Sequence, residues 1–290
     1  MNAISPPVGD PTNTLQVRTL LATETIAVRD VRCDGACGHR SPSECATATQ
    51  LVFPYRGTFQ RHVGRTATVA EASQMVFFNA DEEYCVSHPV GGGDACLSIA
   101  PDPALLLELA SVDQLDNRPR ATFNRPAHGI DPRAQALVAL LRHSLGQGTI
   151  ETLEAETLAL TLIRRSLGER TSHVRATTYG RARLVDRTKL LLAADPGRRW
   201  ALAEIATEMG VSPVYLTQVF KQVEGVPLYR YQLRLRLSRA LDLLPRCTDL
   251  TGLALDLGFS SHSHFTAAFR GQFGRSPSAL MLAAGARRIA

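Results

Sequence analysis

Apolar and polar positions follow different rhythms in the two halves of this chain. Between about residue 16 and residue 100, short apolar runs are separated by clusters of glycine, proline, asparagine and aspartate. This pattern is typical of β-strands joined by turns. The runs expected to be strands include Gln50–Pro54, Thr66–Ala70, Gln74–Phe78 and Tyr84–Ser87. Several short strands with frequent turns predict a β-sandwich or a small barrel.

After residue 100 the apolar positions recur at helical spacing. Asp102 followed by Pro103 has the composition of a helix start, so we expect a short helix that ends near Ala110. Longer helices are expected over Pro132–Leu145 and Glu151–Leu167. The apolar stripe expected on the second of these combines Leu153, Thr157, Leu160 and Ile163, widened by Leu158, Leu162 and Leu167. The stripe does not say whether it packs on the β-region or on a second chain.

From Tyr179 onward the pattern predicts only short helices. They are expected at 181–194, 200–208, 213–223, 228–243, 249–256 and 261–273. A repeat lies within this region, because the eleven residues Leu202–Ser212 correspond to Leu250–Ser260 at an offset of 48. Each copy continues into a helix with an aromatic residue, Phe220 or Phe269, followed directly by a basic one.

The first copy of the repeat predicts a helix-turn-helix. Leu202, Ile205, Ala206 and Met209 are expected on one apolar face. Gly210 can adopt the left-handed conformation that ends a helix, and Ser212 before Pro213 can cap the next one. The second helix of such a unit can enter the major groove of DNA. Two units in tandem, joined by a long helix, strongly favour a DNA-binding domain over a plain helical bundle.

Charge is distributed in agreement with this prediction. Residues 181–290 contain 16 Lys+Arg and 8 Asp+Glu, a balance of +8, whereas residues 1–180 contain 16 and 19, a balance of −3. A basic C-terminal half beside a slightly acidic N-terminal half suggests that only the C-terminal half faces a polyanion.

Residues 181–284 resemble the DNA-binding domain of the AraC/XylS family of bacterial regulators. Two stretches carry the resemblance, 202–237 and especially Ala254–Pro277. The resemblance implies two helix-turn-helix units joined by a rigid helix, which read successive major-groove faces on one side of double-stranded DNA. It also implies a cupin-like N-terminal sensor, a homodimer, and RNA polymerase as a partner. The fold class expected is therefore α+β, with an N-terminal cupin-like β-barrel or sandwich and an all-α C-terminal domain.

The resemblance places the DNA contacts on the second helix of each unit. The candidates are Val214, Tyr215, Thr217, Gln218 and Lys221 in the first unit and His262, Ser263, Thr266 and Arg270 in the second. Gln218 has the chemistry to pair with adenine, and Lys221 suits a phosphate. Ala267 offers only apolar contact, and His264 precedes the core residue Phe265, where it could simply cover the bundle.

The N-terminal half contains candidate binding residues of two kinds. Arg56, His62 and His88 could supply polar contacts to a small-molecule effector in an apolar cavity. Cys33, Cys37, His39 and Cys45 could hold a metal, since Cys33 and Cys37 have a spacing that zinc sites use. Arg32, Arg40 or His39 could instead lower the pKa of Cys33 or Cys37 and produce a redox-sensitive thiolate. Scattered thiols in a loop remain the simplest interpretation.

Other functional classes fit the sequence less well. A regulator with methyl-accepting repair activity would use such cysteines, but the second Cys pair of its zinc site is missing. The N-terminal half has no tight His-x-His pair, and no catalytic serine elbow, phosphate loop or dinucleotide fingerprint occurs in the chain, so we expect neither an enzyme nor a resident cofactor. An architectural DNA binder would not need about 170 additional residues.

The expected organisation has four segments. They are a mobile arm at 1–15, a β-rich effector-sensing and dimerisation domain at 16–170, a linker at 171–180, and the DNA-binding domain at 181–290. The sequence shows no apolar run long enough to cross a bilayer and no export signal at its start, so we expect a cytoplasmic protein without membrane contact.

Overall fold

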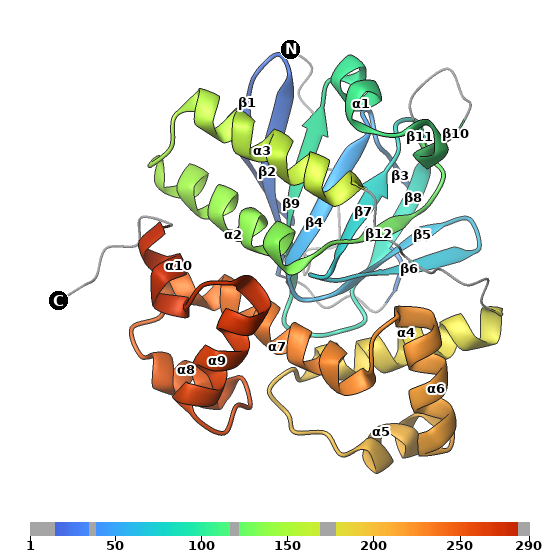
Figure 1. Cartoon of the computed structure of the whole chain (residues 1–290). Coiled ribbons are helices and arrows are strands. Elements are labelled where there is room, and N and C mark those ends of the chain that lie inside the picture. The colour runs from blue at the N-terminus through green and yellow to red at the C-terminus, as the bar shows by residue number, and fades with distance from the viewer. Residues whose placement is uncertain (1–14, 35–38, 117–121, 169–177, 284–290) are drawn as a thin grey trace.

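The computed structural model describes residues 15–34, 39–116, 122–168 and 178–283. An N-terminal part of strands and helices lies against a C-terminal part made of helices, which confirms the expected α+β class (Figure 1). The expected arm and most of the expected linker lie outside the described residues, so the domain boundaries stay predictions. Within the described residues, no helix combines the length and the apolar character that crossing a membrane requires.

The N-terminal part contains twelve strands among the described residues. They are β1 (Leu15–Ala22), β2 (Ile26–Cys33), β3 (Glu44–Cys45), β4 (Gln50–Arg56), β5 (Phe59–Val63), β6 (Thr66–Ala70), β7 (Gln74–Phe78), β8 (Glu83–Ser87), β9 (Asp94–Pro101), β10 (Leu115–Asp116), β11 (Thr122–Phe123) and β12 (Ala127–Gly129). The larger sheet has the order β1-β2-β9-β4-β7-β12, the smaller one has the order β3-β8-β5-β6, and β10 pairs with β11. The described strands thus form open sheets, and the cupin-like resemblance stays a prediction.

The α-helices from α1 to α9 fall where the sequence predicts them, within a few residues, whereas α10 was not predicted. The helices of the described chain are α1 (Pro103–Leu109), the 3-10 turn η1 (Val112–Gln114), α2 (Pro132–Gln147), α3 (Thr152–Leu167), α4 (Tyr179–Ala194), α5 (Leu202–Met209), α6 (Pro213–Glu224), α7 (Leu228–Leu243), the 3-10 turn η2 (Leu244–Arg246), α8 (Leu250–Asp256), α9 (His262–Phe273) and α10 (Pro277–Ala283). Asp102 caps α1 as expected, because its side chain accepts a hydrogen bond from the amide of Ala104.

The larger sheet has a core on each of its faces. Leu51, Phe53 and Tyr55 of β4 point toward α1, α2 and α3, where they join a cluster that includes Leu141 and Leu162. Val52 of β4 points the other way, into a second cluster with Val76 of β7, Cys96 of β9 and, from the smaller sheet, Phe59 and Ala70. This alternation follows from the pleat of a strand, which sends successive side chains to opposite faces. Because both faces of the sheet are covered, nearly every residue of β4 and β9 is buried.

The buried face of α3 matches the predicted stripe at Leu162, Ile163 and Leu167 but differs from it in the first half of the helix. Ala155, Ala159, Leu162 and Ser166 are buried, whereas Leu153 is 76% exposed and Thr157 is exposed. Small side chains at positions 155 and 159 let α3 pack closely against its neighbours in the cluster above the sheet. Hydrophobic periodicity misplaces this face because it gives leucine more weight than alanine, although a close contact favours the smaller residue.

Candidate DNA-binding interface

The first helix-turn-helix unit consists of α5 and α6. Gly210 ends α5 with φ +71°, and the hydroxyl of Ser212 accepts a hydrogen bond from the amide of Tyr215 at 3.2 Å. Ile205, Ala206 and Met209 of α5 are buried against α4, α6 and α7, as expected. Leu202, predicted on the same face, is 40% exposed, because it is the first residue of the helix and lies at the rim of the core.

The second unit consists of α8 and α9, and its turn is one residue longer. Gly258 has φ +79°, but the cap of α9 is Ser261, whose hydroxyl accepts a hydrogen bond from the amide of His264 at 3.1 Å. The offset between corresponding residues therefore rises from 48 before the turn to 49 after it. Counted from the caps, Thr217 corresponds to Thr266, and Lys221 corresponds to Arg270.

The predicted contact residues lie on the outer surfaces of α6 and α9. Val214 is 65% exposed and Tyr215 is 43% exposed. Gln218, Lys221, Ser263, Ala267 and Arg270 are also exposed, whereas Thr217, His262 and Thr266 are half-buried. Counted from the helix caps, His264 is equivalent to Tyr215. Its ring packs edge-on against that of Phe259, with 5.5 Å between the two ring centroids. The residue-by-residue match of the repeat thus places His264 on the same outer face.

Glycine lets the two units approach each other at backbone distance. A Cβ on Gly197, in the turn between α4 and α5, would lie 2.4 Å from the carbonyl oxygen of Asp256, and one on Gly258 would lie 2.1 Å from the carbonyl oxygen of Gly197. Real Cβ contacts do not come below about 3 Å, so neither position accepts a larger residue without a shift. The two glycines therefore help to set the distance between α5–α6 and α8–α9.

Arginine side chains tie the same two turns together. Arg199 donates to the carbonyls of Gly258 and Phe259 at 3.2 and 3.1 Å. Arg236 of α7 donates to the carbonyls of Pro196, Arg198 and Gly258 at 2.9, 2.9 and 3.2 Å. Sequence reasoning missed this fixed junction, because the basic residues of the region suggest DNA contact before they suggest carbonyl partners within the protein.

The N-terminal part contacts α4 and α7, which pack against the first unit, through a buried cluster of charges. The Nζ atom of Lys189 in α4 lies 3.1 Å from a carboxylate oxygen of Glu71 and 3.1 Å from one of Glu224. Tyr231 of α7 donates its hydroxyl to the other oxygen of Glu71. Burial alone lowers the pKa of Lys189, but Glu71 and Glu224 raise it above its ordinary value. Lys189 therefore keeps its positive charge in a buried position because these carboxylates compensate it.

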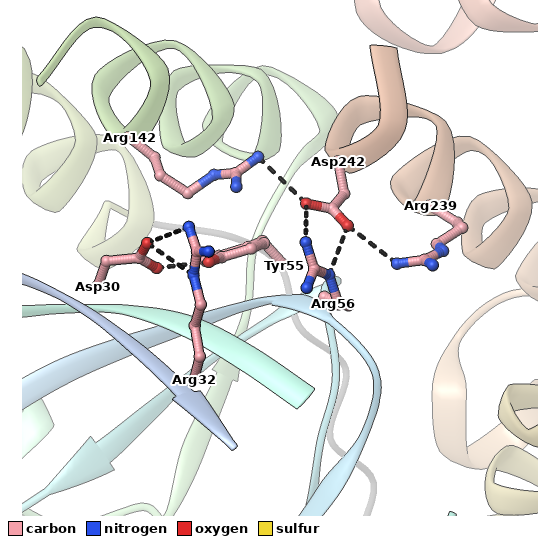
Figure 2. A network of polar contacts seen from close by, with 7 residues as sticks. All are labelled: Asp30, Arg32, Tyr55, Arg56, Arg142, Arg239 and Asp242. Atoms are coloured by element: carbon pink, nitrogen blue, oxygen red, sulfur yellow. Dashed lines mark hydrogen bonds and ion pairs between the residues drawn. The ribbon is translucent and has the colours of Figure 1, made fainter. Parts of the chain in front are cut away.

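A second cluster joins the N-terminal part to α7. Asp242, whose side chain is 1% exposed, accepts a hydrogen bond from Nε of Arg56 at 2.8 Å and lies 3.3 Å from Arg142 of α2. Arg239, one turn earlier on α7, donates to Asp242 at 2.9 Å. Figure 2 shows Asp242 between these three guanidinium groups, with Arg56 and Arg142 reaching it from the N-terminal part. Asp242 thus compensates positive charge from both parts of the chain.

A separate polar group lies beside this cluster in the N-terminal part. The hydroxyl of Tyr55 donates to Asp30, which also binds Arg32 at 2.7 Å (Figure 2). Burial and the hydrogen bond to Asp30 raise the pKa of Tyr55 to about 12. The guanidinium of Arg142 lies over the ring of Tyr55 at 3.9 Å, so the two groups are in contact.

The three candidate effector-binding residues are each engaged by a different partner. Arg56 binds Asp242, His62 lies 2.8 Å from the hydroxyl of Ser87, and His88 forms an ion pair with Asp94. A pocket of about 790 Å³ lies elsewhere in the N-terminal part. Its lining includes Arg61, Asn79, Glu82, Asp116 and Phe123, and none of the three candidates. A shared effector site for Arg56, His62 and His88 stays a prediction.

The candidate metal ligands do not lie together as the sequence suggested. Cys37 lies outside the described residues, Cys45 is exposed on β3, and His39 is exposed. Within the described part of the chain, the possible ligand atoms of Cys33, His88 and Asp94 lie close to one another. Neither His39 nor Cys45 is part of this cluster. Burial alone lowers the pKa of His88, but hydrogen bonds with Asp94 and Cys33 raise it to about 10.

Comparison with known proteins agrees with the geometry of the C-terminal part. Residues 205–282 match a family model described as a helix-turn-helix domain. The chain is 29% identical to the virulence regulon transcriptional activator VirF of Yersinia enterocolitica over 145 residues, which are 50% of this chain and 53% of VirF. It is 33% identical to the HTH-type transcriptional activator RhaR of Klebsiella pneumoniae over 137 residues, which are 47% of each protein. The chain thus spans about half the length of these curated relatives.

The chain is also similar to a regulator whose structure has been solved. A transcriptional regulator from Chromobacterium violaceum, described as containing an AraC-type DNA-binding domain, is 30% identical to this chain. The match covers 37% of this chain and 96% of the other, with a TM-score of 0.35.

Proposed function

The C-terminal part of this chain belongs to the AraC type of helix-turn-helix domains, and on this premise we propose that the whole protein is a sequence-specific DNA-binding regulator of transcription. One observation carries the proposal above all. The helices α6 and α9 begin at equivalent serine caps and expose equivalent outer faces, while α7 and the junction at Gly197 and Gly258 hold them at a fixed separation. Two such helices can enter successive major grooves.

The outer face of α6 has the richer chemistry for base recognition. Gln218 offers an amide that can pair with adenine, and Val214 offers a methyl contact for thymine. The equivalent positions in α9 are Ala267 and Ser263, which have fewer donors and acceptors. Lys221 and Arg270 occupy equivalent places near the end of each helix and suit phosphate contacts. We therefore propose that α6 contributes most of the sequence preference and α9 contributes mainly position and affinity.

The N-terminal part is proposed to control how the DNA-binding part is presented. It holds α4 through Glu71 and α7 through Arg56, so a small-molecule effector that shifts these contacts would shift the DNA-binding helices. We further propose a homodimer, since two linked DNA-binding parts gain affinity on paired sites. VirF and RhaR are both named activators. We therefore propose activation at promoters in the cytoplasm, with RNA polymerase as a partner.

Selection of bound sequences from random duplex DNA tests this function. The full chain is incubated with the library at about 150 mM salt, where nonspecific phosphate binding is weakened. Enrichment of one motif, or of two half-sites about one helical turn apart, is the expected result. Binding without any enriched sequence, which declines smoothly as salt rises, would identify an architectural DNA binder and contradict the proposal.

A further inference from the structure

Three buried side chains with different donor atoms meet at one end of the two sheets. Cys33 ends β2, Asp94 begins β9, and these two residues are paired in the register of the larger sheet. His88 directly follows β8 of the smaller sheet. One ligand atom of each residue, the sulfur, a ring nitrogen or a carboxylate oxygen, lies within 4.8 Å of the other two. The exposed fractions are only 3% for Cys33, 8% for His88 and 8% for Asp94.

We propose that Cys33, His88 and Asp94 bind a divalent transition-metal ion of the zinc class. Sulfur, imidazole nitrogen and carboxylate oxygen are the three donor types that zinc accepts, whereas calcium and magnesium prefer oxygen alone. Donor atoms around a tetrahedral zinc ion lie about 3.3–3.6 Å apart, given its usual bond lengths. The upper limit of 4.8 Å includes this range, and His88 and Asp94, now in direct contact, would move apart to admit an ion.

The backbone around the group is fixed by close contacts. Gly93, immediately before Asp94, has φ +71°, and a Cβ there would lie 2.5 Å from the carbonyl oxygen of Cys33. Gly57, with φ +64°, packs in turn on Gly93, since its Cβ would lie 2.2 Å from the carbonyl oxygen of that residue. These contacts require glycine and hold the start of β9 against the end of β2. Two of the three ligands are thus preorganised.

A simpler account is that the three side chains contact one another without a metal, since His88 interacts with both Asp94 and Cys33. The ring centroid of His88 lies 6.5 Å from that of Phe59, so an apolar ring stands near the imidazole. A thiol beside an imidazole and a carboxylate in such surroundings has the composition of a metal site with three protein ligands. A metal ion there would connect β2 and β9 of the larger sheet to the end of β8.

Direct metal measurements on the full-length chain test this proposal without any DNA. Wild-type protein is stripped with a chelator, reloaded with Zn²⁺ in competition with a chromophoric chelator, and analysed for metal content by mass spectrometry. Co²⁺ is then added in place of Zn²⁺, because a bound thiolate produces a charge-transfer band. The variant Cys33→Ser keeps the size of the side chain but weakens it as a ligand. The control Cys247→Ser removes a half-buried cysteine of the C-terminal part.

The expected result is one Zn²⁺ per wild-type chain, retained in Cys247→Ser and bound at least ~100-fold more weakly in Cys33→Ser. Circular dichroism establishes that the variants are folded. If Cys33→Ser does not fold, Asp94→Asn and the Co²⁺ spectrum of the wild type decide the question. Failure of the wild type to compete for Zn²⁺, a Co²⁺ spectrum without a thiolate band, or equal Zn²⁺ affinity in a folded Cys33→Ser or Asp94→Asn variant would overturn the proposal.

Discussion

Asp242 of α7 accepts a hydrogen bond from Arg56 of β4 at 2.8 Å, although 186 residues separate them along the chain. The carboxylate is buried and surrounded by Arg56, Arg142 and Arg239. Since α7 joins the two helix-turn-helix units, this contact links the β-sheet directly to the element that sets their relative position. Through this contact, α7 connects the N-terminal part of the protein to both DNA-binding units.

Replacing Asp242 by Asn is expected to lower the free energy of unfolding by about 2–4 kcal/mol. The change removes the only negative charge among three guanidinium groups in the described cluster, and a broken buried pair leaves uncompensated charge. Chemical denaturation of both proteins measures the difference. Glu208→Gln, at an exposed position of α5, is the control and should change stability by less than about 0.5 kcal/mol. Equal stability of Asp242→Asn and wild type would show that solvent compensates the arginines.

Lys189→Met is expected to cost about 3–5 kcal/mol, because it leaves the carboxylates of Glu71 and Glu224 without their buried cation. The double variant Glu71→Gln/Lys189→Met should recover part of this loss, since it also removes one of the two carboxylates. Thermal and chemical unfolding of the two single variants and the double variant form a thermodynamic cycle. Strictly additive effects would mean that the 3.1 Å contact between Lys189 and Glu71 carries no coupling energy.

Asp186 of α4 gives the stability a dependence on pH. Burial raises its pKa from 3.8 to about 6, with Glu224 and Glu71 adding to the rise and Lys189 opposing it. The folded chain thus binds this proton more tightly than the unfolded chain, so the contribution to stability is full below pH 3.8 and is lost as pH rises to about 6.

Asp186→Asn is therefore expected to stabilise the protein by about 1–3 kcal/mol at pH 7.5 relative to wild type. The difference should shrink as pH falls toward 4.5, where Asp186 is largely protonated. Denaturation curves at the two pH values provide the measurement. The same difference at both values would exclude titration of Asp186 as its cause.

Gly197→Ala is expected to weaken binding to a site that both units contact. The new Cβ would lie 2.4 Å from the carbonyl oxygen of Asp256, so the two units must move apart. Gly271→Ala in α9 is the matched control, because a Cβ there has no neighbour within 4 Å and alanine favours a helix. Fluorescence anisotropy with the selected DNA should show at least ~10-fold weaker binding for Gly197→Ala and little change for Gly271→Ala. Equal affinities would mean that the junction does not set the spacing.

Gln218→Ala is expected to lose discrimination of about 1–3 kcal/mol at one base position. Gln222→Ala, which removes another exposed amide from the last turn of α6, should keep the wild-type preference. Repeating the sequence selection with each variant gives the answer. A motif unchanged by Gln218→Ala would place that side chain outside the groove, whereas uniform weakening at all positions would indicate a phosphate contact.

Much of the helical half of the protein was predictable because its determinants are local. Gly210 and Ser212 lie within three residues of the turn that they produce, so capping chemistry alone predicts the ends of α5 and α6. The start of α9 was predicted one residue early, at 261, because Ser260 and Ser261 are both able to cap, and only the path of the longer turn selects Ser261. The strands β6 and β7 were also predicted to the residue, since alternation and turn residues are local patterns.

The sequence by itself thus determined the repeat, the helix-turn-helix units and the class of the C-terminal part. Only the tertiary structure decided which residues of α3 are buried, that Arg56 pairs with Asp242 of α7, and that Cys33 lies beside His88 and Asp94. Such contacts depend on how distant segments pack, because burial and charge compensation are properties of the assembled core. A local pattern contains no information about which distant side chain supplies the partner.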